Sequence, residues 1–219
     1  MSVSFKNIQK TYLNNSKPVI CNLNLKIKEG EFLALTGPSG SGKTTVLRML
    51  AGLEKPTSGE IFMDKKNIMN IPSKDRFISM VFQQTNLYPY MSAAKNISFV
   101  LKSSGLAKSK IELLVKDIMR DLELTQFSSY MPSMLSGGQK RRVAIARAMV
   151  RVMAKKARIF LLDEPLVNLE SRLKTKISLQ ISALQKEFKI TTIYVTHDET
   201  EALDIADKIV VLDKGILQR

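Results

Sequence analysis

The sequence predicts an α/β fold in which helices cover a mainly parallel β-sheet. Segments with strand patterns alternate along the chain with segments whose apolar residues recur at helical spacing, as in doubly wound sheets. One run, Ile159–Leu162, is continuously apolar, as expected of a parallel strand covered on both faces. A glycine-rich loop at 37–45 stands between a predicted strand and a predicted helix. With 219 residues, the chain can bury the core of one domain with a subdomain.

The N-terminal part predicts an antiparallel β subdomain. Val3–Ile8 and Cys21–Ile27 alternate between apolar and polar residues, which is typical of half-buried antiparallel strands. Asn14–Pro18 lies between them and predicts a turn region. Glu60–Asp64 is a further predicted strand, preceded by a turn at Pro56–Gly59.

A phosphate-binding loop is indicated between the predicted strand Glu31–Thr36 and a helix that ends at Gly52. The loop consists of Gly37, Pro38, Ser39, Gly40, Ser41, Gly42, Lys43, Thr44 and Thr45. Its glycines allow backbone N–H groups to approach phosphate oxygens, and the N-terminus of the following helix adds partial positive charge. We expect Lys43 to reach the β- and γ-phosphates of a nucleotide and the Thr44 hydroxyl to ligate Mg²⁺.

The middle of the chain predicts an α-helical subdomain at about 88–151, after a strand at Ile78–Phe82 that ends in Gln83 and Gln84. A weak amphipathic pattern at 94–101 precedes a stronger one. The stronger stripe is made by Ile111, Val115, Ile118 and Leu122.

The C-terminal part returns to alternating helices and strands. Leu173–Phe188 has the cleanest amphipathic helix pattern in the chain, and Thr192–Thr196 predicts a strand. Glu199–Ala206 predicts a helix, Lys208–Leu212 a strand, and Asp213–Gly215 a turn into a short last strand.

Two carboxylates follow the apolar run Ile159–Leu162. In open α/β sheets, the carboxyl ends of parallel strands face the ligand crevice, so Asp163 is placed to hold Mg²⁺ directly or through water. Glu164 is placed to polarise an attacking water as a general base, worth roughly 10²–10⁴-fold in rate. Acidic residues commonly end strands, but a phosphate-binding loop in the same chain favours the catalytic interpretation.

A second candidate anion site precedes the predicted helix 140–151. Ser136 and Gln139 have the spacing of a capping box at its N-terminus. The capping box does not explain the two adjacent glycines, Gly137 and Gly138, which expose backbone N–H groups at that end of the helix.

The composition excludes some classes and leaves others open. A single cysteine, Cys21, excludes an internal disulfide. Lys6 and Lys10 interrupt the N-terminus where a signal peptide would be apolar, and no apolar run approaches the ~20 residues of a membrane span. We therefore expect a soluble or peripheral protein. The net charge of +14 is spread along the chain, and the aromatic residues do not interleave with it, so solubility is its default explanation.

Several of these motifs resemble the ATP-binding cassette family, the motor subunits of ABC transporters. Leu135–Gln139 matches the family's signature motif, and Ile159–Glu164 matches its Walker B strand with the catalytic glutamate. Gln83 matches the Q-loop glutamine, His197 the switch histidine and Tyr12 the aromatic residue that stacks on adenine. The similarity covers essentially the whole chain, with the order and spacing of the motifs preserved.

The resemblance implies a fold with a phosphate-loop NTPase core, an N-terminal antiparallel β subdomain and an α-helical subdomain. It implies that ATP and Mg²⁺ bind between two cassettes packed head to tail, where the signature of one caps the γ-phosphate held by the loop of the other. The implied catalytic residues are Lys43, Gln83, Glu164 and His197, and the implied Mg²⁺ ligands are Thr44, Gln83 and Asp163. Gln84 could take the role of the Q-loop glutamine in place of its neighbour, but the register of the family motif favours Gln83.

Within the family, the motifs most resemble bacterial importer ATPases for sugars, glycerol phosphate and polyamines. This implies a peripheral protein at the cytoplasmic face of the membrane, whose partners are a second cassette, integral membrane permease subunits and an extracytoplasmic solute-binding protein. The rival from another class is a soluble cassette that acts on ribosomes or DNA, although neither tandem cassettes nor a long coiled-coil insertion is present and we expect no nucleic acid. A binding module that no longer hydrolyses ATP is disfavoured by intact Lys43, Asp163, Glu164 and His197.

The chain departs from the family pattern in three places. In the loop after Glu164, Val167 replaces the family's usual serine and Glu170 its usual aspartate, which leaves the cross-dimer contacts of that loop open. Arg151–Arg158 is longer than the family's usual short turn and predicts a helix extension or a basic surface loop. Sugar-importer relatives continue into a C-terminal regulatory domain, whereas this sequence ends at Arg219. We therefore expect 1–219 to form one nucleotide-binding domain without the regulatory domain, which is either a minimal cassette or a fragment.

Overall fold

The computed structural model describes residues 1–13 and 17–218, so residues 14–16 of the predicted turn lie outside the described part. The contacts within the chain define two compact units. The first unit comprises residues 1–80, 158–164 and the chain from 189 onward, and the second comprises 81–157 and 165–188.

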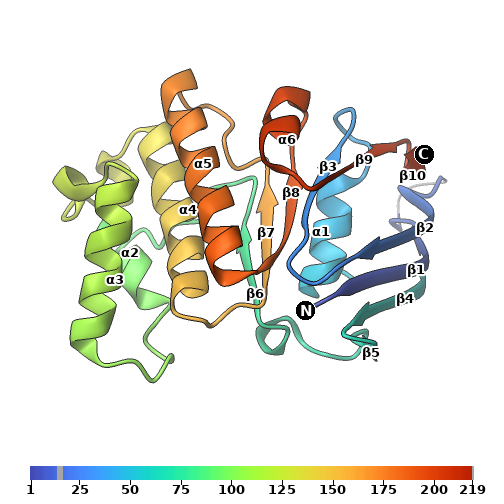
Figure 1. Ribbon diagram of the computed structural model, residues 1–219, viewed down its shortest axis with the longest axis horizontal. Coiled ribbons are helices and arrows are strands. Elements are labelled where there is room, and N and C mark those ends of the chain that lie inside the picture. The colour runs from blue at the N-terminus through green and yellow to red at the C-terminus, as the bar shows by residue number, and fades with distance from the viewer. Residues whose placement is uncertain (14–16, 219) are drawn as a thin grey trace. The chain divides into compact units, whose positions relative to one another are not determined.

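The first unit contains an antiparallel sheet in the strand order β2-β1-β4-β5 (Figure 1). Its strands are β1 (Val3–Lys10), β2 (Ile20–Ile27), β4 (Ser58–Met63) and β5 (Lys66–Asn67). Buried and exposed residues alternate along β2, because one face of this sheet packs on the core. The predicted antiparallel pairing of the first two strands is confirmed, since Val3 faces Ile27 and Phe5 faces Leu25.

A second sheet has the order β10-β9-β3-β8-β7-β6. Its strands are β3 (Phe32–Thr36), β6 (Ile78–Val81), β7 (Ile159–Asp163), β8 (Thr191–Val195), β9 (Lys208–Asp213) and β10 (Ile216–Gln218). The pairs β3–β9, β3–β8 and β7–β8 are parallel, and the terminal β10 pairs antiparallel with β9. Every residue of β3, β7 and β8 is buried. The prediction of an α/β fold with a mainly parallel sheet is confirmed.

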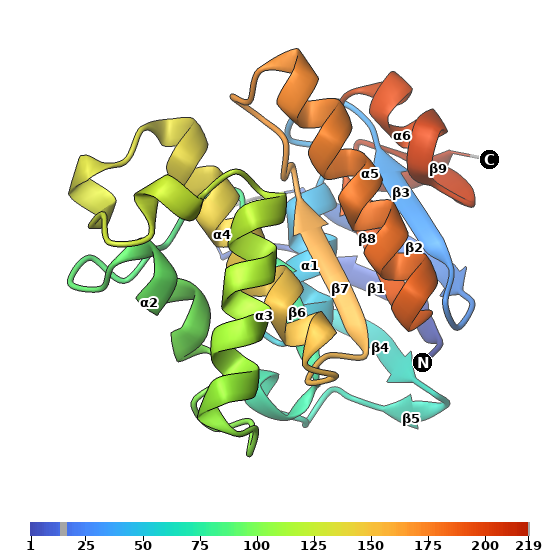
Figure 2. The same ribbon diagram turned by 60° about the vertical axis from the view of Figure 1, so that its left-hand side comes forward.

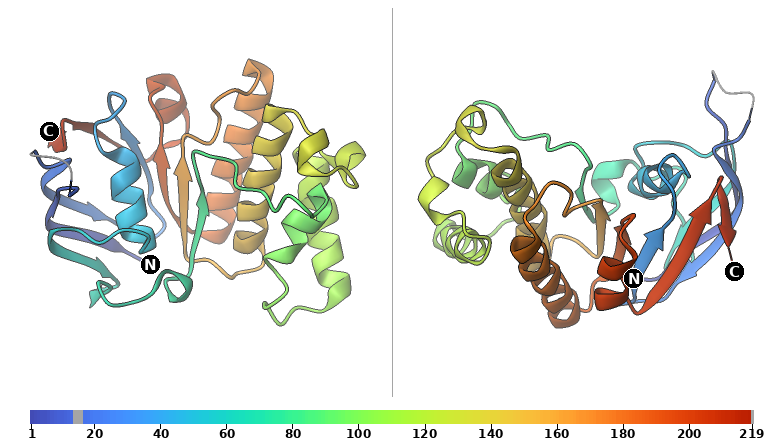
Figure 3. Two further views of the ribbon diagram at one scale, coloured as in Figure 1. Left: turned by 180° about the vertical axis from the view of Figure 1, so that it is seen from behind. Right: turned by 90° about the horizontal axis from the view of Figure 1, so that it is seen from above.

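Helix α1 (Lys43–Ala51) lies between the two sheets of the first unit (Figure 3). Its apolar residues share one core with both sheets, including Leu47 and Leu50. The helix ends at Gly52, whose φ of 74° is the left-handed conformation that glycine adopts readily. The unit also contains the short helices η1 (Ser73–Asp75) and α6 (Glu199–Ile205).

A buried arginine secures the C-terminal end of α1. Arg76 is 6% exposed, and its Nη1 donates hydrogen bonds to the carbonyls of Met49 and Leu50 at 2.9 and 2.8 Å. Its Nη2 and Nε donate to the carbonyls of Ile68 and Ile71, both at 2.9 Å. Burial lowers the pKa of this guanidinium. One side chain therefore satisfies carbonyls at the end of α1 and holds the segment 68–71 beside it.

The second unit is helical and is built around α4 (Figure 2). Its helices are α2 (Ala93–Phe99), α3 (Lys108–Asp121), α4 (Gly137–Met153) and α5 (Ser171–Phe188), with one-turn helices η2 (Thr125–Phe127) and η3 (Pro132–Met134). The sequence places the helical subdomain at 88–151 and does not indicate that α5 belongs with it. In the structure α5 packs on α4, so the second unit includes a helix that follows β7 in the sequence.

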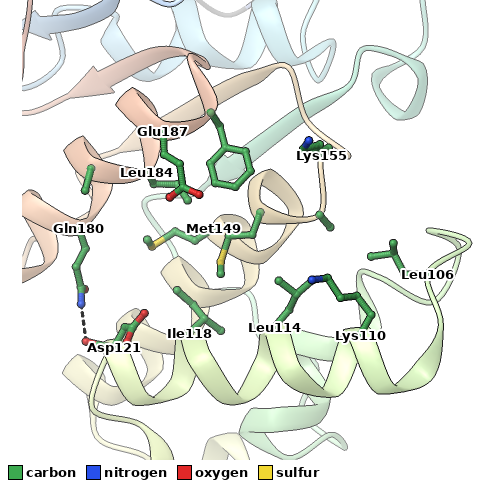
Figure 4. Close-up of a pocket in the computed structure, with 14 residues that line it drawn as sticks. Leu106, Lys110, Leu114, Ile118, Asp121, Met149, Lys155, Gln180, Leu184 and Glu187 are labelled. Carbon is green, nitrogen blue, oxygen red and sulfur yellow. Dashed lines mark hydrogen bonds between the residues drawn. The ribbon is translucent and has the colours of Figure 1, made fainter.

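The atypical segment Arg151–Arg158 begins as a helix extension, because α4 continues through Met153. Met153, Ala154 and Lys155 then line a cavity of about 680 Å³ between α3, α4 and α5, and Lys155 lies at one end of it (Figure 4). At the opposite end, Gln180 Nε2 donates a hydrogen bond to the Asp121 carbonyl at 2.7 Å. None of the residues singled out for nucleotide chemistry lines this cavity.

Candidate functional site

The glycine loop runs from the end of β3 to the start of α1. Gly37, Gly40 and Gly42 have φ values of 137°, 78° and 104°, which favour glycine. A Cβ atom at Gly37 would overlap the Leu212 carbonyl, and one at Gly42 would lie 2.5 Å from the Ile20 side chain. A Cβ atom at Gly40 would meet no atom within 4 Å. Close packing therefore requires the outer two glycines, while Gly40 lies on an open side that a ligand can approach, beside the exposed Pro38 and Ser39.

Lys43 lies beneath this loop and is only 5% exposed. Its ammonium donates hydrogen bonds to the carbonyls of Gly37 and Pro38, both at 2.8 Å. Burial lowers the pKa of Lys43, and the charges of Glu164 and Asp163 partly offset that effect. An ammonium has three N–H groups, and two of them bind these carbonyls, so the third can donate to an anion. Bound phosphate would favour the charged form that burial penalises.

Ser41 supplies a second sign that the loop is built for a ligand. Its hydroxyl oxygen is buried and has no hydrogen-bond partner among the residues that the structure describes. Unpartnered buried polar atoms are costly and call for an explanation at each site. In a phosphate-binding loop, an oxygen atom of the bound phosphate can supply the missing hydrogen-bond partner of this hydroxyl.

The hydroxyl after Lys43 meets the first Walker B carboxylate. Thr44 Oγ1 donates a hydrogen bond to Asp163 Oδ1 at 3.0 Å, and Asp163 is 1% exposed at the end of β7. A hydroxyl and a carboxylate are oxygen ligands of the kind that Mg²⁺ prefers, so these residues fit a Mg²⁺ site. Among the described residues, no group of three or more His, Cys, Asp and Glu side chains could hold a metal by itself. Substrate oxygens and water would have to complete the coordination.

Glu164 follows in a strained conformation and lies near the histidine of the chain. Its φ is 46°, and its N–H donates to the Val195 carbonyl at 2.9 Å, which fixes the turn after β7 against β8. Glu164 Oε1 lies 3.7 Å from His197 Nδ1. The glutamate side chain is 16% exposed and the histidine side chain 58% exposed, so both can be reached from solvent.

His197 is positioned by the start of α6. The Asp198 side chain caps this helix by accepting hydrogen bonds from the N–H groups of Thr200 and Glu201 at 3.0 and 3.2 Å. The Asp198 N–H in turn donates to the Thr196 hydroxyl at 3.0 Å. These bonds fix the backbone on both sides of His197 while its ring remains exposed.

Tyr12 lies against the first turn of α1. Its hydroxyl shares a hydrogen bond with Thr45 Oγ1 at 3.3 Å, and the ammonium of Lys10 lies 4.8 Å from the centre of its ring. The structure therefore places Tyr12 in the same unit as the phosphate-binding loop and next to its last residue.

The signature residues and Gln83 belong to the second unit. The expected capping box is present, because Ser136 Oγ accepts from the Gln139 N–H at 3.2 Å and Gln139 Oε1 accepts from the Ser136 N–H at 2.8 Å. A Cβ atom at Gly137 would meet nothing within 4 Å, and one at Gly138 would lie 3.5 Å from Leu169. The N-terminus of α4 is thus open at Gly137, and the Gln83 side chain is exposed in the same unit.

The loop, the hydroxyl–carboxylate pair and the glutamate together define a phosphate-loop nucleotide-binding core. The chain belongs to the ABC transporter family, because the family model described as ABC transporter matches residues 20–167. The resemblance found in the sequence is therefore confirmed.

Relatives in the family are ATP-binding proteins of uptake systems. The chain is 44% identical to the diacetylchitobiose uptake system ATP-binding protein MsiK of Streptomyces coelicolor, which it matches over 100% of its own length and 57% of the relative. It is 45% identical to the maltose/maltodextrin import ATP-binding protein MalK of Photorhabdus laumondii, over 98% and 56%. The chain thus spans somewhat more than half the length of the curated relatives it matches.

The fold also matches a solved cassette. The ATP-binding cassette MJ0796, in a dimeric post-hydrolysis state bound to ADP and Pi, superposes with a TM-score of 0.88 at 35% sequence identity. The match covers 99% of this chain and 97% of that chain. Both the fold class and the family are therefore supported by sequence and by structure.

Sequence reasoning missed two features of the site. The positive φ of Glu164 is one, since glutamate gives no sign of it in the sequence. The other is Arg141 on α4, whose guanidinium binds backbone carbonyls beside Gln83 and after Glu164. The sequence indicates this role only by the position of Arg141, two residues after Gln139. A basic residue at that position is equally expected on a solvent-exposed helix face.

Proposed function

We propose that this chain is the ATP-hydrolysing motor subunit of an ABC importer for sugars or related small solutes. The observation that carries the proposal lies in the first unit, where Thr44 bonds Asp163 and Glu164 lies next to His197. The lysine of the phosphate-binding loop in the same unit has an N–H donor left for phosphate.

The residues then have separate roles. Lys43 and the loop N–H groups hold the β- and γ-phosphates, and Tyr12 stacks on the adenine. Thr44 and Asp163 would hold Mg²⁺, with Gln83 assigned to the ion by the family pattern, and the ion would neutralise charge that develops on the phosphate oxygens. Glu164 takes a proton from the attacking water, and His197 contacts the γ-phosphate. The exposed histidine at 3.7 Å from the glutamate is consistent with this division of roles.

The second anion site requires a second cassette. Ser136, Gly137, Gly138 and Gln139 present the open N-terminus of α4, a 17-residue helix, to a ligand outside their own unit. In a head-to-tail dimer the γ-phosphate held by the partner's loop occupies that position. The dimeric state of the related cassette MJ0796 supports this arrangement, and a homodimer is its simplest form.

The remaining partners follow from the transport class. No helix among the described residues is long and apolar enough to cross a membrane. In this proposal, separate permease subunits form the pathway. We propose that the cassette binds them at the cytoplasmic face, and that an extracytoplasmic solute-binding protein delivers the solute. The names of the relatives, which are uptake and import proteins, support this choice.

A soluble ATPase acting on ribosomes or DNA is the second candidate, favoured by the net charge of +14. Hydrolysis by the purified chain should be measured with membranes from its native cells, with RNA and with DNA. The importer proposal expects stimulation by the permease subunits, and nucleic-acid binding that is weak and falls steeply with salt. Specific stimulation by RNA or DNA at physiological salt would instead support the second candidate.

A further inference from the structure

We propose that Arg141 is a positioning residue that holds the backbone of the Gln83 segment and the backbone that follows Glu164 in one fixed arrangement. The proposal rests on the proposed function, because it assigns these two segments to the hydrolytic site. It concerns a side chain that neither the family motifs nor the relatives' names assign a role.

The contacts of Arg141 join two segments that are far apart in the sequence. The residue lies in the first turns of α4 and is 4% exposed. Its Nε donates a hydrogen bond to the carbonyl of Pro165, the residue bonded to Glu164, at 2.8 Å. Its Nη1 donates to the carbonyls of Phe82 and Gln83 at 2.5 and 2.9 Å.

The chemistry of the guanidinium makes this a rigid link. Nε and Nη1 belong to one planar group, so the carbonyl of Pro165 and those of Phe82 and Gln83 are held at a fixed separation. Hydrogen bonds from a charged donor are short and strong, and burial strengthens them further. A lysine has a single donor atom and cannot span both segments in this way.

The consequence is that the backbone of the assigned metal ligand and the backbone of the residue after the assigned base share one support. Gln83 carries the amide assigned to Mg²⁺, and its own carbonyl is bound by Arg141. Pro165, whose carbonyl Arg141 binds, is bonded directly to Glu164, the assigned base. Displacements of about 1 Å at such groups can slow a reaction by up to ~10²-fold.

The next residue provides a matched control. Arg142 is also buried, at 9% exposed, and its Nη1 donates to the carbonyls of Leu122 and Glu123, both at 2.9 Å. Its Nε has no partner among the described residues. Arg142 therefore has the same chemistry on the same helix, but it supports the end of α3 instead of the two catalytic segments.

The experiment compares Arg141→Lys with Arg142→Lys in the full chain. Hydrogen–deuterium exchange without nucleotide should rise at 82–87 and 166–169 in the first variant and at 120–126 in the second. For ATP hydrolysis, kcat of Arg141→Lys should fall between about 10- and 100-fold with KM little changed. Arg142→Lys should lose no more than about threefold.

A double-mutant cycle with Gln83→Ala separates positioning from general destabilisation. If Arg141 acts in part through Gln83, the loss of activity in the double variant should be smaller than the product of the two single losses. The losses caused by Arg142→Lys and Gln83→Ala should instead multiply. The proposal would be overturned if the activity losses multiply in both cycles. It would also be overturned if hydrogen–deuterium exchange at 82–87 is unchanged in Arg141→Lys. Arg141→Gln provides the same readouts if the lysine variant does not fold. If Gln83→Ala and Glu164→Gln themselves hydrolyse ATP normally, the proposed function fails instead.

Discussion

Glu164→Gln should separate catalysis from folding and from nucleotide binding. The amide keeps the volume and the backbone turn of Glu164, including the N–H bond to Val195, but it cannot accept a proton from water. Loss of a general base costs roughly 10²–10⁴-fold in rate, which corresponds to about 3–5 kcal/mol in the activation free energy.

The effect of Glu164→Gln on folding should be much smaller. The contact between Glu164 and His197 is 3.7 Å long, and the histidine side chain is 58% exposed. Pairs of this kind contribute at most about 1 kcal/mol to the free energy of unfolding. Because the loop and Lys43 are unchanged, ATP at 100 times its Kd should still stabilise the variant by about 2.7 kcal/mol.

The assay for Glu164→Gln combines phosphate release with thermal unfolding in the presence of ATP and Mg²⁺. Glu187→Gln makes the same chemical change at an exposed position on α5 and serves as the control. A Glu164→Gln variant that keeps more than about a tenth of wild-type turnover, while still being stabilised by ATP, would refute the assignment of Glu164 as the base.

Two further predictions concern buried cations. Arg76→Met should lower the free energy of unfolding by about 3–5 kcal/mol in urea titrations, because four carbonyls around the end of α1 lose a charged donor; a loss below about 1 kcal/mol would contradict that reasoning. For Lys43, burial lowers the pKa in the folded state, so the unfolded chain binds more protons between the folded and unfolded pKa values. Stability should therefore rise with pH through that alkaline window, and Lys43→Met should remove this increment; an identical pH dependence in both proteins would show that the burial of Lys43 has no such effect.

The regular elements of the fold could be predicted because their signals are local. The apolar run Ile159–Leu162 became the fully buried β7, and the helix after the glycine loop ends at Gly52 as expected. The capping box of Ser136 and Gln139 also depends only on residues three positions apart. Each of these features follows from patterns within a few residues.

The features that were missed depend on contacts between distant segments. The predicted helical stretch 88–151 could not reveal that α5 packs with it, because amphipathic periodicity shows that a face is buried but not what covers it. The bonds from Arg141 to Gln83 and Pro165 span 58 and 24 positions in the chain. The positive φ of Glu164 is imposed by its bond to Val195 on a neighbouring strand.

The most direct test of the central claim is a mixture of two inactive variants. Lys43→Ala disables the phosphate-binding loop, and Ser136→Arg blocks the open N-terminus of α4 with bulk. Each variant alone should be nearly inactive, since every site of its homodimer contains one defective half. In a mixed dimer both defects fall in one site, and the other site is intact.

Half of the dimers in an equal mixture are mixed, and one of their two sites is intact. If ATP is hydrolysed between two cassettes, mixing should restore about a quarter of the wild-type rate, provided that the two sites act independently. Light scattering with ATP in a Glu164→Gln background should show the dimer even if both sites must act together. Absence of restored hydrolysis together with absence of ATP-dependent association would contradict the head-to-tail site.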